Sequence, residues 1–386
     1  ANIDEDESRV LILGQCHAEE IYGVEISMAI IECFINPNTC YQNEYIKAEL
    51  ANYLLYSLDN IELWIVPTHN PEGLKVVHGY NDLEGNEIKD PSYRKNIRDA
   101  NSNHTFLENI DWRHGVGFDE DGVDLNRNYD LNWIFGNDHL EGTPSGCASG
   151  KSYNDYYDYY RGNEPFSENE TLAIKNIVSN NQFLLSIAYH SSRSGCVAQR
   201  VVFPWGWKDG DNSDNQRKKS PDYSVIAYIA NQLQRILNFP TAGGAVPQGG
   251  RYGNAHDWMY RETGSIQFLI EVGDFDYQID GLTDHSLLID ENFDETIDLN
   301  LAAFFYLLMI ASGENVPSLE TIALSQITGI ITAQRAAYQC YFAIQASYKL
   351  FQVPNRRSRA SRQSRCMKPL AQTTLNCSRD KQSRFC

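Results

Sequence analysis

Three side chains that can bind a metal ion follow two apolar runs of the sequence. His17 and Glu20 lie three positions apart after the run Val10–Leu13, and His190 directly follows the run Phe183–Tyr189. A spacing of three residues lets the first two side chains share one cation within a single turn of chain. Two imidazole nitrogens and one carboxylate, with a fourth position left for water, form a catalytic zinc site. We therefore predict one zinc ion per chain, held by these three residues.

A carboxylate and two arginines supply the other groups that a hydrolytic zinc site needs. Glu271 stands near the end of the apolar run Ser265–Val272, where a carboxylate is costly unless it is paired or does chemistry. We predict that it takes a proton from the metal-bound water and passes it to the leaving amine. Arg94 is predicted to stabilise the oxyanion. Asn126 and Arg127 are adjacent, and an amide beside a guanidinium suits a terminal carboxylate.

Each of these features also has a structural interpretation when it is taken alone. An isolated His-x-x-Glu pair occurs by chance, and a histidine after an apolar run often packs in a core. A strand-end glutamate can form a salt bridge, and a lone arginine usually forms a surface ion pair. The joint placement of the metal ligands after apolar runs favours chemistry, because ligands bind at the carboxyl ends of strands in open α/β sheets.

Apolar runs that alternate with helical patterns must position these residues. Strands covered on both faces are predicted at Val10–Leu13, Ile61–Val66, Phe183–Tyr189 and Ser265–Val272. Helices are predicted over 23–34, from a capping box of Ser167 and Glu170 to Ser179, over 226–237 and over 296–310. The alternation predicts an α/β fold with a mixed, mostly parallel sheet between helices. The polar stretches 78–125 and 138–166 are predicted to be long functional loops.

Charge is distributed unevenly along the 386 residues. Residues 332–386 contain 11 Lys and Arg and one acidic residue, whereas residues 1–331 contain 21 basic and 50 acidic residues, a formal net charge of −29. So acidic a body repels a phosphate backbone, which excludes nucleic acid as the expected partner. The longest apolar stretch, Leu299–Ala311, is too short to cross a bilayer. We therefore predict no membrane span, and we expect a monomer.

The sequence pattern changes near Val316. We predict a catalytic domain over 1–315 and a C-terminal extension over 316–386. The extension is interpreted as a disordered basic tail, and the alternatives are a docking segment for the acidic body or the remnant of a small β domain. The nine cysteines show no paired spacing, and their odd number leaves at least one thiol unpaired within the chain.

The ordered motifs HAEE, YRKN, GVDLNRNY, YHS and FLIEVG resemble those of the zinc carboxypeptidases of the carboxypeptidase A and T type, over residues 9–313. The resemblance implies a mixed sheet between helices, one zinc ion, peptide or protein C-termini as substrates, and a secreted or periplasmic location. Carried over by position, it implies the zinc ligands His17, Glu20 and His190, the oxyanion residue Arg94, the carboxylate-binding residues Asn126 and Arg127, and the base Glu271. The family's fourteen-residue separation is kept between Asp257 and Glu271.

The chain also departs from the pattern of this family. Glu19 stands where the family often has an arginine inside the His-x-x-Glu motif. The family's substrate tyrosine would fall at Gly249, and Tyr252, three residues later, is the predicted substitute. The segment from His190 to Pro204 is longer than usual. We also expect the edge strands that precede the first zinc-bearing strand in the family to be missing.

His256 occupies the position at the base of the side-chain pocket. It is predicted either to admit polar or acidic terminal residues or simply to pack. The leading function is a metallocarboxypeptidase, and two alternatives stay open. One is a related amidase that acts on cell-wall peptides or side-chain glutamyl peptides. The other is a peptide-binding module on the same fold without catalysis, against which the intact metal ligands and base argue.

Overall fold

The computed structural model describes twelve stretches of the chain. They are residues 7–36, 60–90, 93–100, 102, 121–136, 144–147, 151–154, 159–191, 199–208, 217–248, 252–273 and 293–313. Contacts along the chain separate a compact unit, Ala1–Glu314, from Asn315–Cys386. All described residues lie in the first unit. The C-terminal extension predicted for 316–386 lies outside the described residues and stays a prediction.

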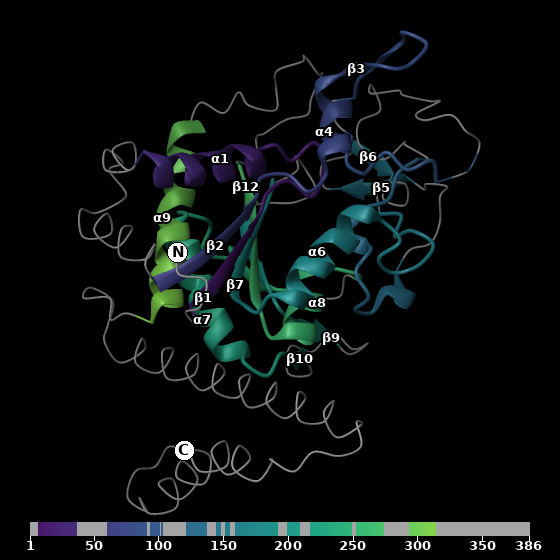
Figure 1. The fold of residues 1–386 in the computed structure, drawn as a ribbon. Helices are drawn as coiled ribbons and strands as arrows, with labels where there is room; N and C mark the ends of the chain where they lie inside the picture. The colour runs from purple at the N-terminus through teal and green to yellow at the C-terminus, as the bar shows by residue number, and fades with distance from the viewer. Residues whose placement is uncertain are drawn as a thin grey trace, which may run out of the picture. The chain divides into compact units, whose positions relative to one another are not determined.

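Six strands form the central sheet, in the spatial order β11-β8-β12-β7-β1-β2 (Figure 1). They are β1 (Ser8–Leu13), β2 (Ile61–Val66), β7 (Phe183–Ser191), β8 (Arg200–Phe203), β11 (Ala245–Pro247) and β12 (Ile266–Val272). Every neighbouring pair is parallel except β8 and β12, which run antiparallel. The mixed, mostly parallel sheet predicted from the alternation of strands and helices is therefore confirmed. The strands β8 and β11 were not predicted, because three or four residues are too few to show a periodicity.

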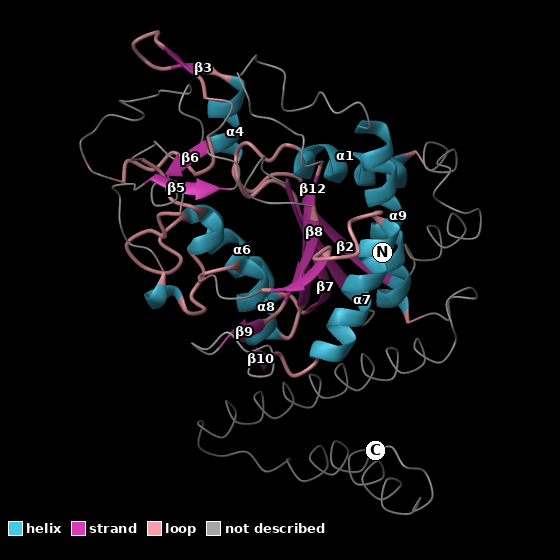
Figure 2. Cartoon of the chain, turned by 180° about the vertical axis from the view of Figure 1, so that it is seen from behind, coloured by secondary structure: helices cyan, strands magenta, loops and turns pink. Residues whose placement is uncertain are grey.

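Helices cover both faces of this sheet, as the two opposite views show (Figures 1 and 2). One face carries α1 (Tyr22–Ile35), α7 (Tyr223–Ile236) and α9 (Phe293–Ser312), and the other carries α6 (Asn169–Asn180) and α8 (Ala255–Thr263). Helix α4 (Pro71–His78) follows β2. Short 3-10 helices span Leu125–Arg127 and Trp133–Phe135. Three hairpins pair β3 (Tyr80–Asn81) with β4 (Glu87–Ile88), β5 (Pro144–Cys147) with β6 (Lys151–Asn154), and β9 (Gly206–Lys208) with β10 (Arg217–Lys219).

Helix α9 is the most apolar helix among the described residues. Its length and composition would allow it to cross a membrane, but 67% of its apolar window is buried inside the structure. The side chains from Asn300 to Ala311 are all buried, and Phe304 packs edge-to-face on Phe34 of α1. The helix is therefore placed as a core helix, over a range that includes the predicted 296–310.

The predicted capping box at the start of α6 is wrong. The residue at the N-cap is Glu168, and its side chain makes no capping hydrogen bond. The hydroxyl of Ser167 instead donates to Glu168 Oε1 at 2.6 Å and accepts from Asn128 Nδ2 at 2.9 Å. Tertiary hydrogen bonds to the segment around Asn128 have therefore replaced the local pattern at this helix end.

The topology brings the predicted site residues to one edge of the sheet. Strands β1, β7 and β12 are adjacent and parallel, so their carboxyl ends meet. His17 follows β1, His190 lies near the end of β7, and Glu271 near the end of β12. His17, His190 and Glu271 are far apart in the sequence, but they therefore lie close together at the carboxyl ends of these strands.

Candidate active site

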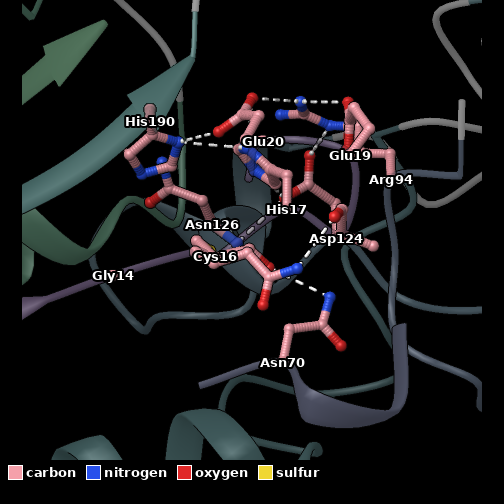
Figure 3. A network of polar contacts seen from close by, with 12 residues as sticks. Gly14, Cys16, His17, Glu19, Glu20, Asn70, Arg94, Asp124, Asn126 and His190 are labelled. Carbon is pink, nitrogen blue, oxygen red and sulfur yellow. Dashed lines mark hydrogen bonds and ion pairs between the residues drawn. The ribbon is translucent and has the colours of Figure 1, made fainter. Parts of the chain in front are cut away.

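The three predicted metal ligands converge in a buried cluster (Figure 3). Glu20 Oε1 lies 2.8 Å from His17 Nδ1, and Glu20 Oε2 lies 2.7 Å from His190 Nδ1. The two Nδ1 atoms are 3.1 Å apart, and one ligand atom from each residue lies within 4.8 Å of the others. Two imidazoles and one carboxylate that face a common point fit a zinc ion, because a cation satisfies all three donor atoms together.

Asp124 holds His17 in the orientation that metal binding requires. Its Oδ1 lies 3.1 Å from His17 Nε2, so the ring carries its proton on Nε2 and presents the lone pair of Nδ1 to the cluster. The other oxygen, Oδ2, accepts from Arg94 Nε at 3.1 Å. Sequence reasoning quoted Asp124 within a motif but gave it no role. The only available signal was an acidic residue inside an apolar, asparagine-rich segment.

The loop that carries His17 and Glu20 is fixed by backbone contacts. Gly14 at its start has no room for a side chain, since a Cβ atom there would lie 2.1 Å from the carbonyl oxygen of Pro67. Asn70 donates from Nδ2 to the carbonyls of Cys16 at 3.0 Å and Lys95 at 3.1 Å. One buried side chain therefore connects the metal-binding loop, the start of α4 and the segment that bears Arg94 (Figure 3).

Arg94 lies among three carboxylates at the edge of the cluster (Figure 3). Besides Asp124, its Nη1 lies 3.3 Å from Glu20 Oε1 and 3.7 Å from Glu19 Oε1. All four side chains are buried. Glu19, which stands where the family often has an arginine, therefore acts as an additional counter-charge for Arg94 in this structure.

The charges of the cluster hold its carboxylates ionised. Burial opposes ionisation of Glu20, but the two histidines, through their charge when they are protonated and through hydrogen bonds, hold its pKa well below the usual range. Burial likewise opposes ionisation of Asp124, and the charges of Arg94 and Arg127 outweigh it and lower its pKa. Burial lowers the pKa of His190, which favours the neutral ring that metal binding needs.

Glu271 is placed next to the metal cluster by strand pairing. It is the register partner of His190 on the adjacent parallel strand. Register partners point to the same face of a sheet, so the Glu271 carboxylate and the His190 ring share one side at the carboxyl end. The structure therefore brings the predicted base to the predicted ligands.

The predicted carboxylate-binding pair lies on the 3-10 helix over Leu125–Arg127. Asn126 accepts the backbone N–H of Ala255 through Oδ1 at 3.0 Å, which leaves its NH₂ group as a donor for an anion. Arg127 Nη1 donates to Asn254 Oδ1 at 3.0 Å and to the carbonyl oxygen of Asn126 at 2.5 Å. Both side chains are buried, and both are tied to the start of α8.

The two residues predicted for substrate selection differ in exposure. Tyr252 is 38% exposed, and its ring packs against Phe135 at 6.2 Å between centroids. His256 is buried in the first turn of α8, with Nε2 3.7 Å from Asp257 Oδ1. Neither placement decides the predicted role, and both roles stay predictions.

Cys16 and Cys33 differ in oxidation state. Cys16, next to His17, is a free and buried thiol, and burial raises its pKa well above the ordinary value. An unpaired thiol was predicted from the odd number of cysteines and is confirmed here. Cys33 on α1 is disulfide-bonded.

Comparisons with known proteins give a consistent result. The model of the zinc carboxypeptidase family matches residues 3–295. Mast cell carboxypeptidase A from Homo sapiens is 25% identical over 240 residues, which cover 61% of this chain and 43% of that protein. The Rattus norvegicus protein of the same name is 29% identical over 152 residues, 39% of this chain and 27% of the relative. The chain therefore spans less than half the length of these curated relatives.

Solved structures share the fold. The crystal structure of thrombin activatable fibrinolysis inhibitor matches 80% of this chain and 63% of its own, with a TM-score of 0.52 and 18% identity. Carboxypeptidase A from Helicoverpa armigera matches 80% of this chain and 62% of its own, with a TM-score of 0.52 and 17% identity. At this level of identity the likeness concerns the architecture.

Proposed function

Because this chain belongs to the zinc carboxypeptidase family, we propose that it hydrolyses the C-terminal peptide bond of peptides or proteins. The observation that carries the proposal is the convergence of His17, Glu20 and His190 at the ends of adjacent strands, with Glu271 in register with His190. The donor set and its burial fit a zinc ion.

The zinc ion, when bound, supplies Lewis-acid chemistry that polarises the scissile carbonyl and makes a water more acidic. Glu271 accepts the proton of the attacking water and returns it to the leaving amine, because its strand position faces the metal ligands. Arg94 stabilises the negative charge that develops on the carbonyl oxygen. Asp124 holds both the His17 ring and the Arg94 guanidinium, so it aligns two parts of the machinery.

The position of the cut follows from Asn126 and Arg127. An amide donor and a guanidinium side by side bind a free terminal carboxylate. A substrate held there presents the peptide bond of its last residue to the metal cluster, which makes the enzyme an exopeptidase. Tyr252 and His256 are proposed to contact the departing residue, His256 from the base of its pocket.

A location outside the cytoplasm is proposed on a separate observation. Cys33 is disulfide-bonded, and disulfides persist mainly in oxidising compartments. A secreted or periplasmic enzyme would meet peptides with free C-termini there.

The test is zinc content together with hydrolysis of blocked dipeptides that carry either a free or an amidated C-terminus. We expect about one zinc per chain and cleavage of the free-carboxylate substrates alone. A side-chain glutamyl peptide in the same panel tests the amidase alternative. Zinc with no cleavage of any substrate would indicate a binding module, and absence of zinc would overturn the proposal.

A further inference from the structure

One aromatic ring contacts both of the arginines that the proposed reaction uses. The guanidinium carbon of Arg94 lies 5.3 Å from the ring centroid of Tyr159, and that of Arg127 lies 4.9 Å from the same centroid. Both distances are within the range of about 6 Å at which a cation is attracted to the face of an aromatic ring. One tyrosine therefore contacts the residue proposed for the oxyanion and the residue proposed for the carboxylate.

Hydrogen bonds fix the segment that carries this ring. The carbonyl oxygen of Tyr160, the next residue, accepts the backbone N–H of Asp124 at 2.8 Å. The carbonyl oxygen of Arg161 accepts from Asn128 Nδ2 at 2.9 Å. Residues 159–161 are thus attached at two points to residues 124–128, the segment that contains Asn126 and Arg127. The position of Tyr159 is set by the same backbone as the arginine that it contacts.

The charges that surround Tyr159 indicate what its ring does. Arg94 and Arg127 are both buried cations, and their mutual repulsion grows where water is scarce. Arg94 forms ion pairs with Asp124, Glu20 and Glu19, and Arg127 donates hydrogen bonds to Asn254 Oδ1 and to the Asn126 carbonyl oxygen. The negative charge of an aromatic ring face that contacts two such groups stabilises both cations and limits their movement.

We propose that Tyr159 is a positioning residue that sets the spacing between Arg94 and Arg127. The inference rests on the proposed function. The scissile carbonyl and the terminal carboxylate are separated by only the nitrogen and Cα of one residue, so two cations that serve them must keep a fixed separation. A residue that contacts both arginines maintains this separation in the absence of substrate, which lowers the cost of ordering them on binding.

The kinetic test first removes the ring of residue 159 and then keeps its shape while lowering the electron density of its face. Tyr159→Phe should change kcat/KM for a free-carboxylate dipeptide by less than about two-fold, since the ring face remains. Tyr159→Leu should lower it by about ten-fold, mainly through KM. Phenylalanines with increasing numbers of ring fluorines at position 159 should lower it stepwise, because fluorine weakens the ring's negative face at nearly constant shape. Tyr223→Leu removes a ring that lies 4.5 Å from the Lys219 ammonium and serves as the matched control.

Equal kinetics throughout the fluorinated series would overturn the inference, because a merely structural role depends on shape. A second measurement does not depend on catalysis. The unfolding constants of Tyr159→Leu, Arg127→Gln and the double variant should be non-additive by about three-fold or more. If the unaltered protein cleaves nothing, the proposed function fails, and this cycle alone decides: non-additivity supports the contact, and additivity overturns it.

Discussion

Glu271 on β12 lies in register with His190 on β7, in the parallel pair at the centre of the sheet. The proposed base and one metal ligand are therefore fixed relative to each other by backbone hydrogen bonds instead of by side-chain packing. Two side chains placed on paired strands are held more precisely than side chains placed on loops.

Replacing the proposed base should abolish turnover and spare the metal. We expect Glu271→Gln to lower kcat/KM for a blocked dipeptide by about 10²- to 10⁴-fold, the usual contribution of a general base. Zinc content should stay at the unaltered level, because Glu271 is not among the converging ligand atoms. Glu87→Gln, on the exposed end of the β3–β4 hairpin, is the control. Unchanged turnover in Glu271→Gln would remove the residue from the mechanism.

Asp124 should matter for metal affinity although it is not a ligand. Asp124→Asn weakens the acceptor for His17 Nε2 and the partner of Arg94. We expect zinc affinity, measured by competition with a chelator, to fall by about 10- to 100-fold. Asp82→Asn in the β3–β4 turn, where Asp82 bonds Asn86, should leave the affinity unchanged. Equal affinities in the two variants would mean that His17 is oriented by other contacts.

Gly253 should be required beside Arg127, the arginine that is proposed to bind the substrate carboxylate. Its φ is +65°, and a Cβ atom there would lie 2.1 Å from the carbonyl oxygen of Arg127. We expect Gly253→Ala to lower the free energy of unfolding by about 2–4 kcal/mol, through backbone strain and overpacking together, and to raise KM. Gly85→Ala is the matched control, since its φ is +88° with no atom within 4 Å. The control should cost about 1–2 kcal/mol and leave KM unchanged. Equal effects of the two substitutions would contradict the clash.

His69 should make the free energy of unfolding depend on pH. Burial is the main cause that lowers the pKa of His69 to about 4, and its Nδ1 lies 2.9 Å from the Gly14 carbonyl oxygen. The unfolded chain, with an ordinary pKa near ~6.5, binds the proton more readily. The contribution of the neutral ring to stability is therefore complete above pH ~6.5 and is lost as the pH falls toward about 4, by up to about 3 kcal/mol.

The check is denaturant unfolding of the unaltered protein and of His69→Asn, which keeps a donor near the Gly14 carbonyl oxygen. The unaltered protein should lose more free energy of unfolding than the variant between pH 6.5 and 4. Titration of the metal ligands is common to both proteins and cancels in the difference. Parallel pH curves would show that the His69 ring is not buried as a neutral group.

The convergence of the three predicted metal ligands could be anticipated from the sequence, because each ligand is marked by a local signal. His17, Glu20 and His190 follow apolar runs, and such runs mark the central strands β1 and β7. The range predicted for β2 agrees with the structure residue for residue. Glu271 could be found for the same reason, since a charge inside an apolar run is conspicuous.

The supporting contacts could not be predicted, because they join distant segments. Asp124 lies 107 positions from His17, and Asn70 connects Cys16 with Lys95. Tyr159 falls in a stretch that was predicted only as a long polar loop. No periodicity records such contacts, since they depend on how the loops at the sheet edge fold against one another. The failed capping box at Ser167 has the same cause.

Strand β1 is the first of the described strands in sequence order but lies inside the sheet, with β2 on one side and β7 on the other. His17 and His190 are 173 positions apart. A ribosome needs roughly 10 to 35 seconds to add that many residues, and for this time the nascent chain holds two of the three ligands. A zinc ion that needs all three proposed ligands can therefore be captured only after β7 has been made, and a fragment that stops before β7 has no complete site. The zinc content of newly made chains should therefore show whether β1 and β7 have paired.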